Sequence, residues 1–397
     1  MISKRAQLLA PSETLKISAR AKEMAAGGKS IISLSAGEPD FKTPNHICDA
    51  AIKAINDGFH GYTMNTGTAE LRKAIVEKLK RDNNLDYTPD QIVVSNGAKQ
   101  SIGFAILAVV NPGDEVIIPA PYWVSYPEMV KLAEGTPVFI SSHFENNYKI
   151  TPEQLKEAIT TKTRAIILCS PSNPTGASYS RSELKELASV LENHPEIVIF
   201  SDEIYEYINF EGEHTSIAEL SDSLKKRTVV INGFSKGFAM TGWRLGYLAA
   251  DKSIASAMAK IQSQETSAPS SISQKAGETA YNSSLDSVME MKKAFRARRD
   301  FIVDALKKID GIKCFTPDGA FYVFPDVSFY FGKKTGDGTT INNSTELCMY
   351  LLEEVGVAAV PGDAFGEPNG LRLSYAASMS DLEEAMKRLE KGFKSLN

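Results

Sequence analysis

The stretch "EIVIFSDEIY", residues 196–205, decides how the fold is interpreted. Its continuous apolar run, Ile197 to Phe200, is short and β-rich, which predicts a strand buried on both faces, as in a parallel sheet. Ser201 and Asp202 follow this run, and the Asp202 carboxylate is costly to bury unless it meets a cation. A helix-capping aspartate is the alternative interpretation.

Six more short apolar runs of this kind lie between Gln91 and Asp251. They cover residues 91–95, 114–120, 136–141, 164–170, 228–233 and 244–250. Between most of them lie polar stretches in which leucines recur at helical spacing, such as residues 151–159 and 180–194. Alternation of apolar strands with amphipathic helices predicts a mainly parallel sheet covered on both faces. We therefore expect an α/β doubly wound core.

The length of 397 residues exceeds the size at which one hydrophobic core stops growing, so two lobes are expected. After about residue 286 the pattern changes to a long charged helix, 288–309, followed by short strands and further helices. This predicts a smaller α+β domain over residues 289–397 and a large domain over 46–288. Residues 1–45 have no core of their own, and we expect them to pack on the smaller domain.

Composition and charge exclude several classes of protein. Apolar residues at 43% and charged residues at 23% are ordinary for a globular chain, and the net charge of −5 comes without a long basic run. Nucleic acid and membrane are therefore not expected as partners. The scattered cysteines and histidines form no CxxC, HxxxH or HExxH pattern, so we expect no disulfide framework and no metal site. No secretory signal is recognised at the N-terminus, and a cytoplasmic protein is expected.

Polar residues follow the predicted strands at their carboxyl ends, where open α/β sheets bind ligands. Gly97 and Ala98 follow residues 91–95 at a strand-to-helix junction, where free N–H groups can seat a phosphate, although a plain tight turn also fits. Asn173 stands between two prolines after residues 164–170, and a structural turn is again an alternative. Residues 228–233 lead to Ser235 and Lys236.

Lys236 has unusually apolar neighbours for a solvated lysine, although an exposed turn lysine remains an alternative. With Asp202, Asn173 and the following Arg244, the strand ends supply an amine, a carboxylate, an amide and a guanidinium. This set matches an aromatic aldehyde phosphate with a pyridine nitrogen. Lysine forms a Schiff base with the aldehyde, a carboxylate keeps the ring nitrogen protonated, and arginine clamps the phosphate. The residues therefore predict pyridoxal 5′-phosphate as cofactor.

At this point the chain resembles a known family. "SNPTG", "SDEIY", "SKGFAMTGWRLGY" and "GLRLSYA", in this order, resemble the fold type I pyridoxal-phosphate aminotransferases of class I. "SAGEPDF", "GYTMNTGTAELRKAI", "NGAKQ" and "PYWVSYPEM" are similar to the bacterial aspartate aminotransferase branch, subgroup I-beta. The resemblance covers nearly the whole chain. It implies a homodimer that acts on small amino acids and 2-oxo acids.

The resemblance also implies a role for each matching residue. Lys236 binds the cofactor and moves the substrate proton, Asp202 pairs with the pyridine nitrogen, and Tyr205 and Asn173 bond the ring's phenolic oxygen. Trp123 stacks on the ring and borders the substrate. The phosphate is assigned to Gly97, Ala98, Ser235, Arg244 and, from a neighbouring subunit, Tyr62. The substrate α-carboxylate is assigned to Arg372, Asn173 and the Gly37 backbone.

Two positions depart from the pattern of the family. Gly233 stands where many relatives have a phosphate-binding serine, and residues 262–271 lack the arginine that binds the distal carboxylate elsewhere. The branch uses a lysine and an N-terminal Ser/Thr segment instead, which here implies Lys99, Ser12 and Thr14. Members that accept prephenate tend to have a lysine just before that segment, and this chain does not. Prephenate is therefore the less expected substrate.

The sequence hypothesis is an aspartate aminotransferase that passes the amino group of L-aspartate to 2-oxoglutarate in a ping-pong cycle. An aminotransferase for aromatic amino acids or prephenate is the nearest alternative, because fold and cofactor site do not decide the side-chain pocket. A lyase of the same fold is another. A non-catalytic regulator that kept the cofactor domain is a fourth hypothesis, but no basic helix-turn-helix extension precedes Ser12 and the reactive positions are filled.

Overall fold

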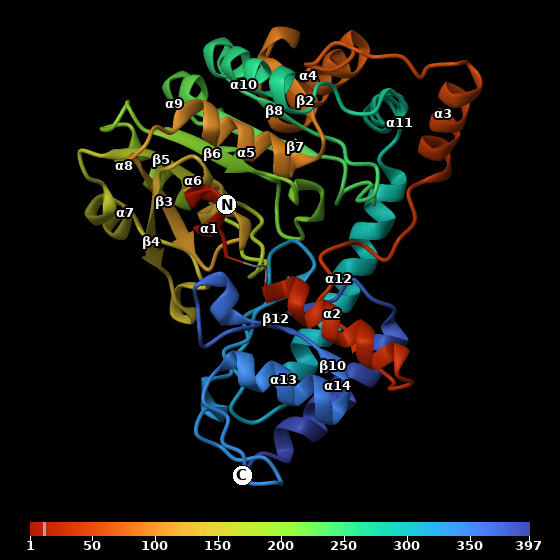
Figure 1. Ribbon diagram of the computed structural model, residues 1–397, viewed down its shortest axis with the longest axis vertical. Helices are drawn as coiled ribbons and strands as arrows, with labels where there is room; N and C mark the ends of the chain where they lie inside the picture. The colour runs from red at the N-terminus through yellow and green to blue at the C-terminus, as the bar shows by residue number, and fades with distance from the viewer. Residues whose placement is uncertain (11–12) are drawn as a thin grey trace.

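The computed structural model describes residues 1–10 and 13–397, without the side chains of residues 13–16 and 18. It forms two clusters of elements, one above the other in Figure 1. The upper cluster is built on one large sheet, and the lower cluster combines short strands with helices from both ends of the chain. Helix α12 (Asp286–Leu306) runs from the upper cluster into the lower one.

The large sheet has seven strands in the order β2-β8-β7-β6-β5-β3-β4. Its strands are β2 (Ile92–Ser95), β3 (Glu115–Ala120), β4 (Thr136–Ser141), β5 (Thr163–Cys169), β6 (Val198–Asp202), β7 (Thr228–Gly233) and β8 (Gly246–Ala249). β8 runs antiparallel to both neighbours, and the other pairs are parallel. The predicted α/β fold with a mainly parallel sheet is confirmed.

Helices cover both faces of this sheet because each has one apolar side. One face carries α5 (Ala98–Val109), α6 (Ser125–Leu132) and α10 (Lys252–Glu265), whose apolar residues share a core with the strands. The other face carries α4 (Ala69–Asn83), α7 (Pro152–Ala158), α8 (Arg181–Leu191), α9 (Asp222–Arg227) and α11 (Ser271–Asn282), with α3 (Asn45–Asn56) packed on α11. In α8, the buried residues Leu184, Leu187, Ala188 and Leu191 recur at the helical period, as the sequence predicts.

The lower cluster contains a three-stranded sheet, a two-stranded sheet and two helices. The strands are β9 (Tyr322–Val323), β11 (Val360–Pro361) and β12 (Leu371–Ser374), with β1 (Ile32–Ser33) paired to β10 (Val357–Ala358). The helices are α13 (Ser344–Val355) and α14 (Met379–Lys394). Helix α2 (Glu13–Ala26) buries Ala21 and Met24 in the same core. The domain boundaries at 45/46 and 288/289 stay a prediction.

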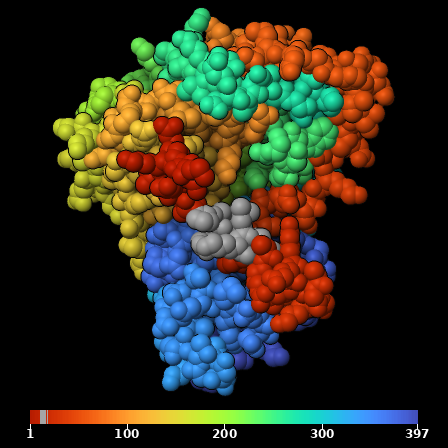
Figure 2. Space-filling model, in the orientation of Figure 1, coloured from red at the N-terminus to blue at the C-terminus, as the bar shows by residue number. Residues whose placement is uncertain are grey.

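The N-terminal segment contacts both clusters. The short helix α1 (Lys4–Gln7) lies on α6 of the upper cluster, whereas α2 lies on the lower one (Figure 2), where β1 pairs with β10. Arg5 forms an ion pair with Glu134, and the Ala10 N–H donates to Glu128 Oε2 at 2.9 Å. No helix in the described part of the chain is both long and apolar enough to cross a bilayer.

Candidate active site

A cavity of about 380 Å³ opens at the carboxyl edge of the large sheet, where it meets the lower cluster. Parallel strands end at this edge, and Asp202 is in register with Cys169 on one side and Ile231 on the other. The sequence-predicted residues that line the cavity are Gly37, Ala98, Lys99, Trp123, Asn173, Asp202, Tyr205, Ser235, Lys236, Arg244 and Arg372. The fold therefore brings together residues that are far apart in the chain, and their roles stay predictions.

The amine of Lys236 lies on the cavity wall just beyond the end of β7. Its Nζ donates a hydrogen bond to the Gly37 carbonyl oxygen at 2.6 Å and lies 6.0 Å from the centre of the Tyr205 ring. Burial lowers the pKa of Lys236 to about 8, and the cations Arg244 and Arg372 act in the same direction. A neutral, nucleophilic amine is therefore accessible near neutral pH.

The Asp202 carboxylate is buried at the end of β6, with 5% of the residue exposed. Tyr126 donates its hydroxyl to Oδ2 at 2.7 Å, and the Ile204 N–H donates to Oδ1 at 3.3 Å. Burial raises the pKa of Asp202 to about 6, although both hydrogen bonds oppose the shift. A cationic ring nitrogen placed beside this carboxylate would relieve the cost of its burial.

Arg372 is a buried cation on β12, and the described residues form no ion pair with it. Its Nη1 donates to Asn173 Oδ1 at 3.0 Å, and its Nη2 donates to the Ser35 carbonyl oxygen at 2.8 Å. The guanidinium lies 4.7 Å from the centre of the Tyr322 ring, whose hydroxyl shares a 3.0 Å hydrogen bond with Tyr205. Because these contacts fix the planar group without neutralising it, Arg372 can receive an anion from the cavity.

The N-terminus of α5 forms an anion seat against Arg244. Gly97 caps the helix without a side-chain hydrogen bond, and no acceptor for the N–H groups of Ala98 and Lys99 is found in the described part of the chain. Arg244 has a positive φ of 54°, and a Cβ at Gly97 would lie 2.4 Å from its Nη2. Free helical N–H groups facing a guanidinium suit a phosphate.

Close packing of the backbone explains why glycine stands at position 233, which the sequence alone did not explain. A Cβ there would lie 2.9 Å from the Gly246 Cα and 3.0 Å from the Leu245 carbonyl oxygen. Gly246 in turn lies against α5, because its own Cβ would come 2.3 Å from the Ala98 nitrogen. The backbones of β7, β8 and α5 therefore approach too closely for a serine at position 233.

Lys99 lies at the mouth of the cavity, with Nζ 5.2 Å from the centre of the Trp123 ring. Much of its side chain meets solvent, yet partial burial, followed by the nearby Arg244, lowers the pKa of its amine. No carboxylate among the described residues pairs with it. Next to it, Gln100 Nε2 donates to Thr266 Oγ1 at 2.7 Å, which places the stretch 262–271 against the start of α5.

Gly97 does not line the cavity itself but packs against Arg244, which does, and three further predicted residues are not placed there. Tyr62 is fully exposed on the surface of the chain and does not line it. Ser12 lies outside the described residues, and so does the side chain of Thr14, although Thr14 belongs to α2. The prediction for these three residues stays open.

Sequence reasoning missed Tyr126, Tyr322 and Cys169, which also line the cavity. Tyr126 follows Trp123 by three residues, a spacing that puts two side chains on one side of a helical turn, so this signal was present. Tyr322 and Cys169 lie within apolar runs that look like ordinary core.

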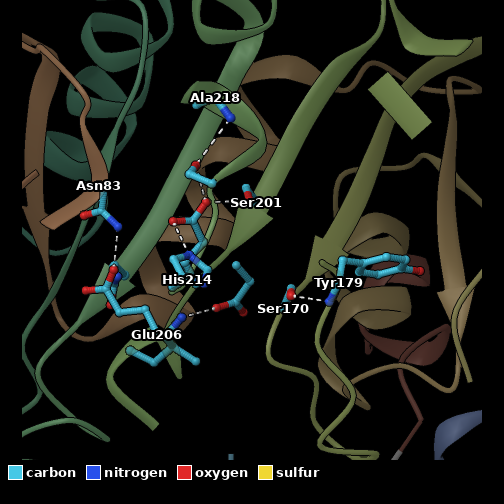
Figure 3. A network of polar contacts seen from close by, with 12 residues as sticks. Asn83, Ser170, Tyr179, Ser201, Glu206, His214 and Ala218 are labelled. Carbon is cyan, nitrogen blue, oxygen red and sulfur yellow. Dashed lines mark hydrogen bonds and ion pairs between the residues drawn. The ribbon is translucent and has the colours of Figure 1, made fainter. Parts of the chain in front are cut away.

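Ser201 at the end of β6 and Glu206 in the turn after it belong to a buried charged cluster (Figure 3). Glu203 accepts hydrogen bonds from Ser201 and Ser216 and pairs with His214 Nε2 at 3.0 Å. Glu206 pairs with the fully buried Lys78 and accepts from Asn83 Nδ2 at 2.8 Å. Asp202 and Tyr205 therefore project from a segment whose other side chains are anchored.

The same cluster contains the one group of possible metal ligands among the described residues, Glu203, Glu206 and His214, with ligand atoms within 4.8 Å of one another. The Lys78 ammonium already contacts Glu206 and opposes a second cation there. A larger hollow of about 670 Å³ borders His214, but its arginines and Lys149 are already paired with neighbouring carboxylates. The residues suited to group-transfer chemistry lie in the smaller cavity.

A family model described as "Aminotransferase class I and II" matches residues 29–389. The chain belongs to this family. An aspartate aminotransferase of Pinus pinaster is 51% identical over 396 residues, which cover 98% of this chain and 80% of the relative. An aspartate/prephenate aminotransferase of Nitrosomonas europaea is 49% identical over 391 residues, 98% of each chain. The crystal structure of the aspartate aminotransferase from Rhizobium meliloti matches with 45% identity and a TM-score of 0.97 over 100% of both chains.

These matches confirm the resemblance, and this aminotransferase uses pyridoxal 5′-phosphate. The cavity fits that cofactor. It combines free N–H groups at α5, a guanidinium held over Gly97, a buried carboxylate and an amine with a lowered pKa. A phosphate, a ring nitrogen and an aldehyde each find a complementary group on this wall.

Proposed function

We propose that this aminotransferase transfers the amino group of L-aspartate to 2-oxoglutarate, giving oxaloacetate and L-glutamate. The observation that carries the proposal is one cavity that is lined by Lys236, Asp202 and Arg372 together. The relatives from Pinus pinaster and Rhizobium meliloti are aspartate aminotransferases, which supports aspartate as the donor.

Pyridoxal phosphate, when bound, supplies an aldehyde that carries the amino group and a ring that accepts electrons. Lys236 would hold the cofactor and then move the substrate proton on its Nζ, for which its lowered pKa is suited. Asp202 would hold the proton on the ring nitrogen, and Trp123 would cover the ring face. Tyr205 and Asn173 would bond the phenolic oxygen.

The phosphate would be held by the N–H groups at Gly97 and Ala98, by Ser235 and by Arg244. Support comes from the close packing of Arg244 on Gly97 and from the buried position of Ser235. Tyr62 of a second copy of the chain would add a further contact.

Substrate binding would begin at Arg372, which receives the α-carboxylate together with Asn173 and the Gly37 backbone. Lys99 would receive the distal carboxylate of aspartate, helped by Ser12 and Thr14. Its position beside Trp123 and its lack of a carboxylate partner among the described residues support this role. A desolvated carboxylate left without a cation would cost several kcal/mol.

The protein is further proposed to be a cytoplasmic homodimer. Apolar side chains on α3 and the following loop meet solvent in the single chain, namely Ile52, Ile55, Tyr62 and Met64. A cluster of this kind favours association with a second copy. All four cysteines are free thiols, as suits a reducing compartment.

The proposal is tested by an amino-donor screen of the holoenzyme against 2-oxoglutarate, with prephenate and phenylpyruvate as alternative acceptors. Aspartate should give the highest kcat/KM. Lys99→Ala should lower kcat/KM for aspartate by about a hundredfold, because the distal carboxylate of the bound substrate would lose its cation, while changing alanine turnover little. Lys260→Ala, an exposed lysine on α10, is the matched control. Equal losses for aspartate and alanine would contradict the specificity role of Lys99, and faster turnover with prephenate would favour that substrate.

A further inference from the structure

Tyr126 contacts two of the groups that border the cofactor cavity. It lies in the first turn of α6 with 2% of its surface exposed, and its hydroxyl donates to Asp202 Oδ2 at 2.7 Å. Its ring meets the Trp123 ring edge to face, with centroids 5.3 Å apart and an interplanar angle of 86°. One rigid side chain therefore connects the carboxylate and the indole.

Among the described residues, Tyr126 provides the side-chain donor to Asp202. The other hydrogen bond comes from the Ile204 N–H at 3.3 Å, and no described lysine, arginine or histidine forms an ion pair with this carboxylate. Burial raises the pKa of Asp202, and the Tyr126 hydroxyl opposes that rise. Without the hydroxyl, the carboxyl group would hold its proton to higher pH.

Core packing alone does not account for the hydroxyl. Tyr126 packs among the apolar residues between α5, α6 and the sheet, where a phenylalanine ring would fill the same space. A buried phenol needs a partner, and this one is directed at the carboxylate rather than at a backbone carbonyl. The contact therefore has a consequence for Asp202 beyond packing.

We propose that Tyr126 is a positioning residue for the cofactor, which keeps the Asp202 carboxylate oriented and charged for the pyridine nitrogen. This inference rests on the proposed role of Asp202. Tyr126 touches Asp202 and not the reacting atoms, so its effect passes through that carboxylate. The hydroxyl should matter only for a cofactor that has a ring nitrogen.

The test uses full-length apoenzyme and two ligands, pyridoxal phosphate and its analogue with CH in place of the ring nitrogen. Kd is measured for both with wild type, Tyr126→Phe, Asp202→Asn and the double variant. The wild type should prefer the natural cofactor, and Tyr126→Phe should reduce that preference by about ten- to a hundredfold, the effect of one charge-assisted hydrogen bond. In the Asp202→Asn background, Tyr126→Phe should change nothing further. Tyr247→Phe, a fully buried tyrosine whose hydroxyl bonds Tyr281, is the control.

Two kinds of result would overturn the inference. They show whether the role of Tyr126 or the role of Asp202 is wrong. If Tyr126→Phe weakens both ligands equally, or adds its full effect in the Asp202→Asn background, Tyr126 is a packing residue and the role of Asp202 stands. If the wild type does not distinguish the two ligands, the role of Asp202 itself is wrong, and the role of Tyr126 is lost with it.

Discussion

Lys236 and Asp202 line the same cavity, and their pKa values shift in opposite directions from the usual values. Burial disfavours the charged form of each, so the pKa of the amine falls to about 8 and that of the carboxyl rises to about 6. Near neutral pH the amine can therefore lose its proton while the carboxylate keeps its charge. A base and an ionic partner thus coexist in one cavity.

The first prediction concerns the amine of Lys236 in the apoenzyme. Because only the neutral amine is nucleophilic, labelling of Lys236 by trinitrobenzenesulfonate should rise with pH through a midpoint near 8. Asp202→Asn removes a negative charge that favours the ammonium, so the midpoint should move lower. Labelling is followed by peptide mass spectrometry, with Nα-acetyl-lysine in the same tube as reference. A midpoint near the ordinary lysine value of about 10.4 would show that the amine is not desolvated.

The second prediction concerns the buried guanidinium of Arg372. Arg372→Lys keeps a positive charge but loses the two-pronged contact with Asn173 and the Ser35 carbonyl. We expect a lower kcat/KM for aspartate, equivalent to a loss of about 2–4 kcal/mol of transition-state stabilisation. The loss should be similar for alanine, since both substrates have an α-carboxylate. Arg299→Lys, a buried arginine paired with Glu211 and Asp300, is the control for loss of a buried guanidinium. Steady-state kinetics that remain unchanged in Arg372→Lys would remove it from the substrate site.

At the scale of elements, the site depends on how closely three backbones approach. Gly233 on β7 faces Gly246 on β8, and Gly246 lies against the first turn of α5. Any side chain at these positions would push the strand pair away from the helix N-terminus. The glycine that departs from the family pattern therefore helps to form the anion seat.

The third prediction follows from this packing. Gly233→Ala and Gly233→Ser should both destabilise the protein, by about 1–3 kcal/mol, because the added atoms meet backbone that cannot rotate away. Both should also weaken phosphate-dependent cofactor binding. Gly336→Ala, where a Cβ would meet nothing within 4 Å, is the matched control and should stay within about 0.5 kcal/mol. Urea unfolding measures each change, and a serine variant that is as stable as wild type would contradict the packing argument.

The large sheet could be predicted from sequence because its strands are continuous apolar runs whose ends change abruptly to polar residues. Asp202, Asn173 and Lys236 were found in this way, since polar residues at the carboxyl ends of parallel strands meet at one edge. The antiparallel β8 was not foreseen. The loop between Gly233 and Gly246 contains no helical crossover, and a parallel return needs one.

The rest of the site could not be predicted from sequence because it depends on long-range contacts. Tyr126 and Tyr322 belong to the buried core by their surroundings, and only the fold shows that their hydroxyls meet Asp202 and Tyr205. The buried pair of Lys78 and Glu206 joins α4 to the turn after β6 across a long sequence separation. Periodicity finds helices and strands, but it does not tell which buried polar groups meet.

At the scale of the whole molecule, α3 and the loop that follows it expose apolar side chains to solvent, namely Ile52, Ile55, Tyr62 and Met64. Tyr62 is fully exposed, so its side chain contributes nothing to the fold of one subunit. If the protein is a twofold dimer in which Tyr62 reaches the other subunit's phosphate, every active site combines Lys236 of one chain with Tyr62 of the other. Two variants that are inactive alone can then complement each other.

The last prediction uses that geometry. Lys236→Ala and Tyr62→Ala are each expected to form folded dimers with little activity, the second because a phosphate contact is lost at every site. After the two are mixed and allowed to exchange subunits, a mixed dimer has one site with both changes and one site with neither. Random exchange should restore about one wild-type site in four, measured as aspartate turnover at a cofactor concentration that saturates wild-type sites but not Tyr62→Ala sites. In the control mixture, Phe329→Ala, which changes an exposed aromatic residue of the lower cluster, replaces Tyr62→Ala. This variant is expected to be active alone, and subunit exchange with Lys236→Ala should not raise the total activity of the mixture. If mixing Lys236→Ala with Tyr62→Ala restores nothing although mass spectrometry shows mixed dimers, Tyr62 does not serve the site of a second subunit.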